Sequence, residues 1–283
     1  MASRALVLGS GGITGIAWEL GILAGLAEHG VDLRGADLVV CTSARSVVGA
    51  LITSGSDLEE LYTSQLAPPG SDRPVRMGIG IIVRWSWAVA RSRGSQQVGA
   101  RVGRMALATA TVPEAERRGI IEARLGVRTW PQQTLLVTAI DAESGEFVAF
   151  DKDSQVADTA VTLIDAVAAS CSVPGVWPPT TIGGRRWIDG GVRSTTNADL
   201  AAGYERIVVL APIARGFRPG TGVAAQVTAL RERARVTLVM PDTAARRNMG
   251  RNVLDLVRRA PAARAGRAQA GSVATEVAHV WSG

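Results

Sequence analysis

Near the N-terminus, two short segments with the pattern of buried strands each run into a turn of small residues and then into a stretch with helical spacing. Residues 5–8 lead into the glycine-rich turn 9–15, after which apolar residues recur at helical spacing until Gly30. Residues 37–40 lead through a second turn to Ser43, and residues 44–53 again have a helical pattern. A strand–turn–helix unit that occurs twice predicts a parallel sheet with helices on its faces.

The rest of the chain continues this mixture of strands and helices. Residues 134–140 and 147–150 flank Glu143-Ser144-Gly145 and predict a hairpin. A second two-stranded segment is centred on residues 183–184 and delivers Trp187-Ile188 to Asp189. Further expected elements are a helix at 158–169 with Asp158 as its cap, strands at 207–210 and 236–240, and a helix at 261–281.

Neither an internal repeat nor a linker is evident, so we expect one α/β domain over residues 1–283. Residues of about 68–103 differ in composition, because proline, glycine, serine and arginine surround an apolar patch that contains Trp85 and Trp87. We interpret this segment as a lid or insertion beside a site. Residues 261–283 are interpreted as a basic, alanine-rich C-terminal helix.

The charge balance adds one feature to this picture. The chain has 31 basic and 25 acidic residues, and Lys152 is its single lysine. This preference for arginine over lysine can reflect a GC-rich bacterial genome as well as a physical requirement. Ten arginines lie between Arg231 and Arg267, against three acidic residues. Such a basic face could make peripheral contact with phosphate-bearing membranes, or it could simply be a solvated helical surface. We expect no binding to nucleic acid, and nothing in the sequence predicts an oligomeric state.

The cysteines and the apolar segments indicate the cellular compartment in which we expect the protein. Cys41 and Cys171 are far apart and lack the spacing of metal ligands, which favours a reducing cytoplasm. Residues 5–8 are too short for a signal peptide. Residues 77–90 are far below membrane-spanning length and are interrupted by Arg84. We therefore expect a soluble, cytoplasmic protein.

The glycine-rich turn 9–15 lies between an expected strand and helix, where backbone N–H groups can converge on an anion. Dinucleotide-binding loops have a similar pattern, but they need an acidic residue that closes the next strand. Here Asp37 opens that strand and Cys41 closes it. This mismatch argues against a dinucleotide site.

Two further turns contain side chains that could act as a nucleophile and a base. Ser43 follows a strand and precedes a helix, as in a nucleophile elbow, although serine is also a common helix cap. Asp189 opens Asp189-Gly190-Gly191 at the end of a strand, although Asp-Gly is also a common tight turn. Together with the glycine-rich turn, these supply a nucleophile, a base and donors for an oxyanion.

Histidine is informative because it is scarce. His29 lies at an expected helix end and His279 near the C-terminus, so neither lies at a plausible catalytic turn. A Ser-His-Asp triad needs a well-placed imidazole. A nucleophilic Ser43 would therefore be activated directly by a carboxylate.

These motifs resemble those of the patatin-like phospholipases. The resemblance lies in residues 10–15, in the elbow from Cys41 to Arg45, in Asp189-Gly190-Gly191 and in the segment Ala169–Pro174. It implies a three-layer α/β/α fold with a mostly parallel sheet. It also implies a Ser43–Asp189 dyad that acts on lipid-like or other acyl esters without a cofactor, and an oxyanion hole made by the backbone N–H groups of Gly11, Gly12 and Ala44.

The chain departs from the family pattern at four positions of the two loops. Ser10, Cys41 and Arg45 stand where the family has glycine, and Thr14 stands where it often has arginine or lysine. Arg45 could lie outward along its helix, close the oxyanion pocket, or place a positive charge near the substrate. We therefore expect Ser10, Cys41 and Arg45 to lie near the substrate or to modulate the site. The alternative function is a silent protein on the same fold, or one redirected to acyl condensation or cyclisation.

Overall fold

The computed structural model describes residues 2–68, 79–216 and 220–282. Its centre is an eight-stranded sheet in the order β10-β9-β1-β2-β3-β8-β7, with β4 paired to β3. Five neighbouring strands are parallel: β10 (Arg235–Val239), β9 (Arg206–Leu210), β1 (Arg4–Leu8), β2 (Leu38–Thr42) and β3 (Thr134–Asp141). Three strands extend the sheet through antiparallel pairings: β4 (Phe147–Phe150), β8 (Arg185–Asp189) and β7 (Thr180–Ile182).

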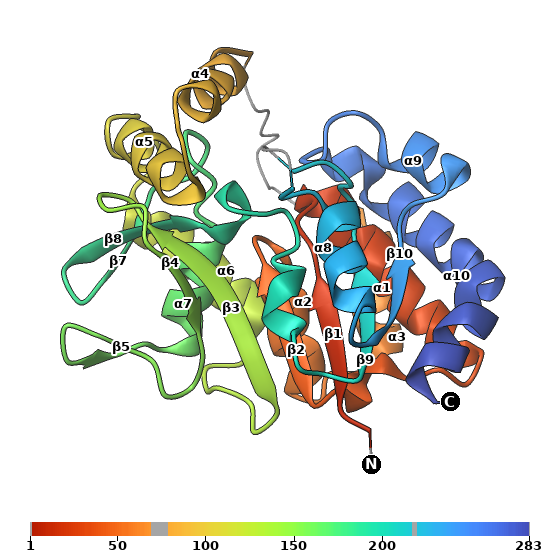
Figure 1. The fold of residues 1–283 in the computed structure, drawn as a ribbon. Helices are drawn as coiled ribbons and strands as arrows, with labels where there is room; N and C mark the ends of the chain where they lie inside the picture. Colours follow the sequence, from red (N-terminus) through yellow and green to blue (C-terminus); the bar gives the residue numbers. More distant parts are fainter. Residues whose placement is uncertain (1, 69–78, 217–219, 283) are drawn as a thin grey trace.

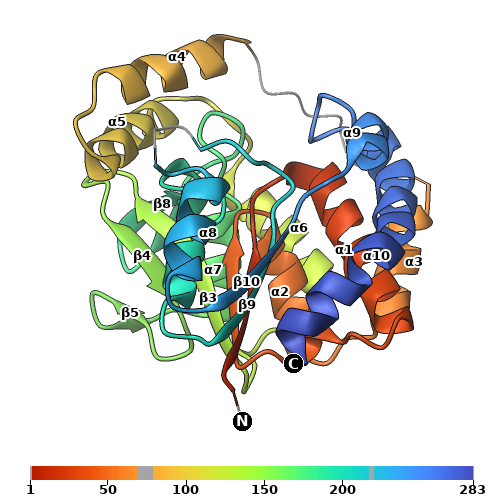
Figure 2. The ribbon, with the colours of Figure 1, turned by 45° about the vertical axis from the view of Figure 1, so that its right-hand side comes forward.

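Helices cover both faces of this sheet (Figures 1 and 2). The first face packs against α1 (Gly12–Glu28), α2 (Arg45–Thr53), α7 (Leu163–Ser170) and α10 (Arg259–Trp281). The second face packs against α8 (Val223–Arg231) and η3 (Ala198–Ala201). The mostly parallel, three-layer α/β/α fold expected from the sequence is confirmed.

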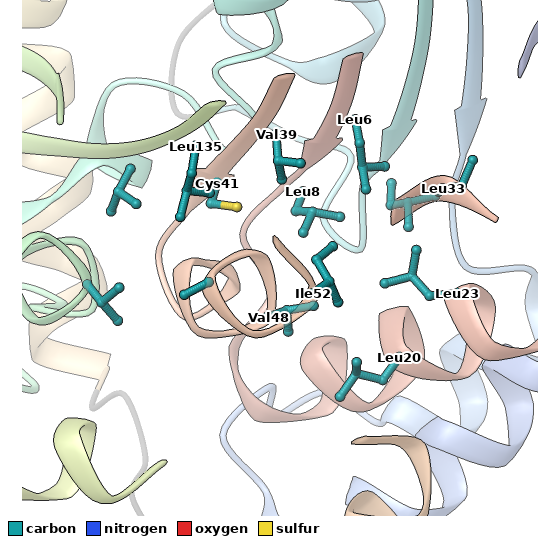
Figure 3. Packing of buried hydrophobic residues seen from close by; sticks show 14 of the residues in the cluster. Leu6, Leu8, Leu20, Leu23, Leu33, Val39, Cys41, Val48, Ile52 and Leu135 are labelled. Carbon is teal, nitrogen blue, oxygen red and sulfur yellow. The ribbon is translucent and has the colours of Figure 1, made fainter. Parts of the chain in front are cut away.

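Alternation along the strands explains why both faces are apolar. Leu6 and Leu8 of β1 face α1 and α2, whereas Ala5 and Val7 face the α8 layer. Figure 3 shows strand side chains of the first face, including Val39 of β2, opposite side chains of α1 and α2. The short apolar runs are therefore buried on both sides, as expected of central parallel strands.

The remaining helices lie around this core: α3 (Leu58–Leu66), α4 (Ile79–Ala90), α5 (Ser95–Leu107), α6 (Glu114–Leu125) and α9 (Thr243–Met249). Part of the expected lid, residues 69–78, lies outside the described residues. The described part of that segment consists of α4 and the first turns of α5, and Trp85 and Ala88 of α4 pack with Val98 and Val102 of α5. None of the described helices is long and apolar enough to cross a bilayer.

One expected helix boundary is wrong. Asp158 does not cap a helix but lies in the turn of a small hairpin between β5 (Gln155–Val156) and β6 (Thr159–Ala160). Ala157 and Asp158 have φ values of 46° and 61°, the left-handed backbone that a two-residue hairpin turn requires. The helix begins only at Leu163, where Thr162 and Asp165 form a capping box.

The expected C-terminal helix packs closely along α1. A Cβ atom added at Gly21 of α1 would overlap the carbonyl oxygen of Ala263, and one at Gly266 of α10 would overlap that of Trp18. The Trp18 indole N–H also donates to Gln269 at 2.9 Å. On its outer side, Arg267 pairs with Glu28 and with Glu59, so part of the basic face serves intramolecular ion pairs.

This contact predicts opposite effects for two helical glycines. Gly266→Ala should destabilise the protein by about 1–3 kcal/mol, because the added methyl group meets backbone that cannot move aside. Gly119→Ala in α6 is the control, since nothing lies within 4 Å of its added Cβ; it should stabilise by about 0.4–1 kcal/mol. Urea denaturation of both variants measures the difference, and equal stabilities would contradict the close packing.

Candidate active site

Ser43 lies on a sharp turn between β2 and α2, with its backbone in the left-handed region at a φ of 63°. This conformation costs energy in a residue other than glycine and persists only where the surroundings hold it. Here the Ser43 N–H donates to Ser170 Oγ at 2.9 Å, and the Ser43 carbonyl accepts from Ser46 Oγ at 2.7 Å. The turn therefore has the backbone of a nucleophile elbow although the flanking glycines are absent.

The structure brings Ser43 and Asp189 together. Ser43 Oγ donates to Asp189 Oδ2 at 2.5 Å, and Asp189 Oδ1 accepts the N–H of Gly191 at 2.7 Å. The two residues are only 6% and 5% exposed. Each carboxylate oxygen thus has a donor, and the one that faces Ser43 is held in position to take its proton.

Burial raises the pKa of Asp189 to about 6. The hydrogen bonds from Ser43 and Gly191 and the positive charge of Arg45 act in the opposite direction and limit the rise in pKa. Asp189 is therefore ionised at neutral pH and yet more basic than an ordinary carboxylate, which suits a general base.

Asn197 supports both turns and was not anticipated from the sequence. It has a φ of 48°, and its Nδ2 donates to Thr42 Oγ1 at 3.0 Å and to the carbonyl of Gly190 at 3.3 Å. One side chain thus connects the end of β2, which carries Ser43, with the turn that follows Asp189. Asparagine tolerates left-handed backbone, but its partners are distant in sequence, so no local pattern marks its role.

The glycine-rich turn borders Ser43. Gly12 has a φ of 61°, and a Cβ there would lie 2.5 Å from the carbonyl oxygen of Val253. Within the described part of the chain, no hydrogen-bond partner is present for the backbone N–H groups of Gly11, Gly12 and Ala44. All three residues line the same cavity as Ser43, and Gly12 is the first residue of α1. Free N–H groups at a helix N-terminus are suited to bind an anion.

Arg45 is buried beneath this turn. Its side chain is 0% exposed, its Nε lies 2.5 Å from Glu19 Oε2, and its Nη1 donates to the carbonyl of Gly12 at 2.6 Å. A Cβ at Gly15 would overlap its guanidinium, so this glycine makes room for it. The interpretation that Arg45 lies outward along its helix is therefore wrong, and Arg45 is not among the residues that line the cavity.

Glu19 was also missed by the sequence analysis. Burial raises its pKa to about 8, and the charge of Arg45 limits the rise. Burial likewise lowers the pKa of Arg45, which the charge of Glu19 opposes. The sequence did contain a signal, because Glu19 is the one charged residue in the otherwise uncharged helical stretch 12–27.

The other two departures from glycine lie in different environments. Cys41 is fully buried, and a Cβ at Gly49 would overlap its sulfur. Gly49 of α2 therefore leaves the space that the Cys41 side chain occupies. Ser10 lines the cavity, and a Cβ at Gly191 would lie 2.8 Å from its Oγ. Of the three, only Ser10 borders the space where a substrate could lie.

A cavity of about 1090 Å³ opens in front of Ser43 and Asp189. Its wall is largely apolar and includes Trp85 of α4. On the wall formed by α6, Arg117 lies 4.0 Å from the ring centroid of Trp177. Other apolar lining residues are Ile13, Ile16, Val112, Ile120, Val173, Val176, Val192, Ile213, Val253, Leu254 and Leu256. An apolar space of this size beside a polar pair is typical of a site for an amphiphilic molecule.

Comparison with known proteins gives matches to one family model and to several solved structures. A family model described as "Patatin-like phospholipase" matches residues 6–202. The crystal structure of VipD from Legionella pneumophila matches with a TM-score of 0.48 and 13% sequence identity, covering 97% of this chain and 67% of VipD. The type III effector ExoU matches with a TM-score of 0.43 and 15% identity, covering 98% of this chain and 53% of ExoU. ExoU of Pseudomonas aeruginosa in complex with SpcU gives a TM-score of 0.42 at 15% identity, again covering 98% of this chain and 53% of ExoU. The chain thus spans about two thirds of VipD and about half of ExoU.

The buried pair predicts a coupled stability effect. Arg45→Met should destabilise the protein by about 3–5 kcal/mol, because it leaves the Glu19 carboxylate buried without its partner. The double variant Glu19→Gln with Arg45→Met should lose less. Urea denaturation measures both, with Arg264→Met on the exposed side of α10 as the control expected within about 0.5 kcal/mol of the parent.

The pH dependence of the two variants should differ as well. The pKa of Glu19 in the folded protein is about 8 even beside Arg45, and loss of the Arg45 charge raises it further above its unfolded value of 4.5. The folded Arg45→Met variant therefore binds the extra proton, and its stability falls as pH rises above about 4.5 and continues to fall beyond 8. The double variant lacks this group and should show less of that fall. Identical pH profiles would show that Glu19 is not the residue left unpaired.

Proposed function

The chain belongs to the patatin-like phospholipase family, whose model matches more than half of its length, and we propose that it cleaves or transfers the acyl group of lipid-like esters through Ser43 and Asp189. The family is one of lipid acyl hydrolases. The observation that carries the proposal is the short hydrogen bond from Ser43 Oγ to Asp189 at the wall of an apolar cavity.

In the first half-reaction, Ser43 Oγ attacks the acyl carbonyl carbon while its proton passes to Asp189 Oδ2. The carbonyl π bond opens and its electron pair moves to the oxygen, giving a tetrahedral oxyanion. When this intermediate collapses, the bond to the leaving alcohol breaks and the alcohol takes the proton from Asp189. The acyl group remains as an ester of Ser43.

In the second half-reaction, Asp189 takes a proton from the acceptor, which attacks the acyl-enzyme. Water as acceptor gives a free acid, so the protein acts as a hydrolase. Another alcohol as acceptor gives a new ester, so it acts as an acyltransferase. The bond between the acyl carbon and Ser43 Oγ then breaks, Asp189 returns the proton to Ser43 Oγ, and the dyad is restored. The dyad and its oxyanion donors suffice for this chemistry without a metal or organic cofactor.

The oxyanion would be held by the N–H groups of Gly11, Gly12 and Ala44, which line the cavity beside Ser43. The Ser43 N–H cannot serve, because it is already used by Ser170. The partial positive charge at the start of α1 adds to the stabilisation of a developing negative charge. Removing one donor of this kind typically costs about 10²–10³ in rate.

The altered elbow residues bear on the alternative of a silent or redirected protein. Cys41 and Arg45 do not line the cavity, and the elbow keeps its left-handed Ser43. The substitutions therefore change the support of the elbow rather than the space for the substrate. This favours a working nucleophile.

The dyad predicts the effect of two variants. Ser43→Ala and Asp189→Asn should each lower the turnover of p-nitrophenyl esters by at least about a thousandfold. A fluorophosphonate probe should label the parent at Ser43, and exposed Ser54→Ala is the control that should be labelled normally. Thermal unfolding checks that the variants are folded. A folded Asp189→Asn protein with parental turnover would rule out the dyad, and an unlabelled parent would favour the alternative.

The pKa of Asp189 predicts the pH dependence of turnover. A general base works in its ionised form, so kcat/KM should rise through an apparent pKa of about 6 and level off above it. Arg45→Met should move this acid limb to higher pH, because the Arg45 charge lowers the pKa of Asp189. Arg264→Met should leave it in place. A limb that stays fixed in Arg45→Met would show that the two charges do not interact.

A further inference from the structure

The outward face of α4 combines apolar and cationic side chains. Val83 is 60% and Trp87 52% exposed, and Arg84 and Arg91 are exposed on the same face, since the four positions follow helical spacing. The Arg91 guanidinium lies 4.4 Å from the ring centroid of Trp87. The opposite face of α4, with Trp85, is buried toward the cavity.

A second segment, η4 (Leu256–Arg258), has the same combination of side chains. Val257 is 72% exposed, the largest exposed fraction of any large apolar residue in the described part of the chain. It lies between Leu256, which lines the cavity, and the exposed Arg258. Arg251, also exposed, lies at the cavity wall.

These two segments border one cavity from different parts of the sequence. Trp85 of α4 and Leu256 of η4 both line it, so the exposed Val83, Trp87 and Val257 lie beside its walls. Figures 1 and 2 show α4 and α9, which precedes η4, at the end of the molecule opposite the N-terminus. This is the end at which β1 and β2 lead into the glycine-rich turn and the elbow.

The chain around both segments has a net positive charge. Residues 79–113 contain five arginines and no acidic residue, and residues 243–275 contain seven arginines and one acidic residue, Asp255. A surface that joins arginines with exposed tryptophan and valine beside an apolar cavity complements an anionic lipid bilayer, because the arginines meet head groups and the apolar side chains enter the interface. Nucleic acid would use the arginines but not the valines.

We propose that α4 and η4 form a docking surface for anionic membranes, which places the cavity against the lipid interface so that an acyl chain can enter. The docking surface is defined by Val83, Arg84, Trp87, Arg91, Val257 and Arg258. The proposal rests on the proposed function for the identity of what enters the cavity, but docking itself needs no turnover.

The test uses the Ser43→Ala protein, so that binding is measured without hydrolysis. In co-sedimentation, it should bind vesicles of phosphatidylcholine mixed with phosphatidylglycerol, bind pure phosphatidylcholine much less, and lose affinity as salt is raised. Arg84→Ser with Arg91→Ser should weaken binding about thirtyfold. Arg128→Ser with Arg233→Ser is the matched control, since these exposed arginines lie just before β3 and β10, at the opposite end of the sheet, and should have no effect.

The apolar part is tested separately. Val83→Ser, Trp87→Ser and Val257→Ser together should weaken binding about tenfold or more, and Trp87→Phe alone should bind nearly as the parent does. The proposal is overturned by absent binding, by equal binding to both vesicle types, or by an equal loss in the control pair. Parental binding in the triple apolar variant also overturns it, since the arginines would then bind anions of any kind. Turnover of a short, water-soluble ester by the parent reports on the proposed function alone, so the two can fail independently.

Discussion

The ion pair between Arg45 and Glu19 joins the two helices whose N-termini border the candidate site. Arg45 lies in the first turn of α2, Glu19 lies in α1, and the guanidinium also donates to the carbonyl of Gly12. The position of the glycine-rich turn relative to the elbow therefore depends on the buried Arg45 guanidinium. Because both partners are fully buried, either one alone would be costly, and the pair behaves as a single element.

Parallel strands explain why the three turns meet. β1 and β2 are adjacent and parallel, so the turns that follow them emerge at one edge of the sheet. β8 runs antiparallel to β3, and its register places Asp189 opposite Ala139, next to the end of β2. Asn197 then connects the two sides through hydrogen bonds to Thr42 and Gly190. The site is thus set mainly by backbone pairing, and a few buried polar groups complete it.

Much of this arrangement could be predicted from the sequence, because strand ends and small-residue turns are local signals. The patterns predicted a parallel sheet with helices on its faces, most of the strands, and the turns that carry Ser43 and Asp189, and the family resemblance added the three-layer α/β/α class. The direction of Arg45 could not be predicted, because it depends on a partner in another helix and on space left by Gly15. The boundary at residue 158 failed because a tight left-handed turn and a helix cap both favour aspartate. The cavity could not be predicted either, since distant segments such as α4 and η4 form its wall.

The contact between Cys41 and Gly49 has a consequence for how such an elbow can change over time. A Cβ at position 49 would overlap the Cys41 sulfur, so a side chain at one position makes a side chain at the other costly, and the two are interdependent. Acquiring Cys41 therefore costs least in a background that already has glycine at position 49. Which residues are tolerated at position 41 therefore depends on the residue at position 49. A search for functional relatives should consider the two positions together.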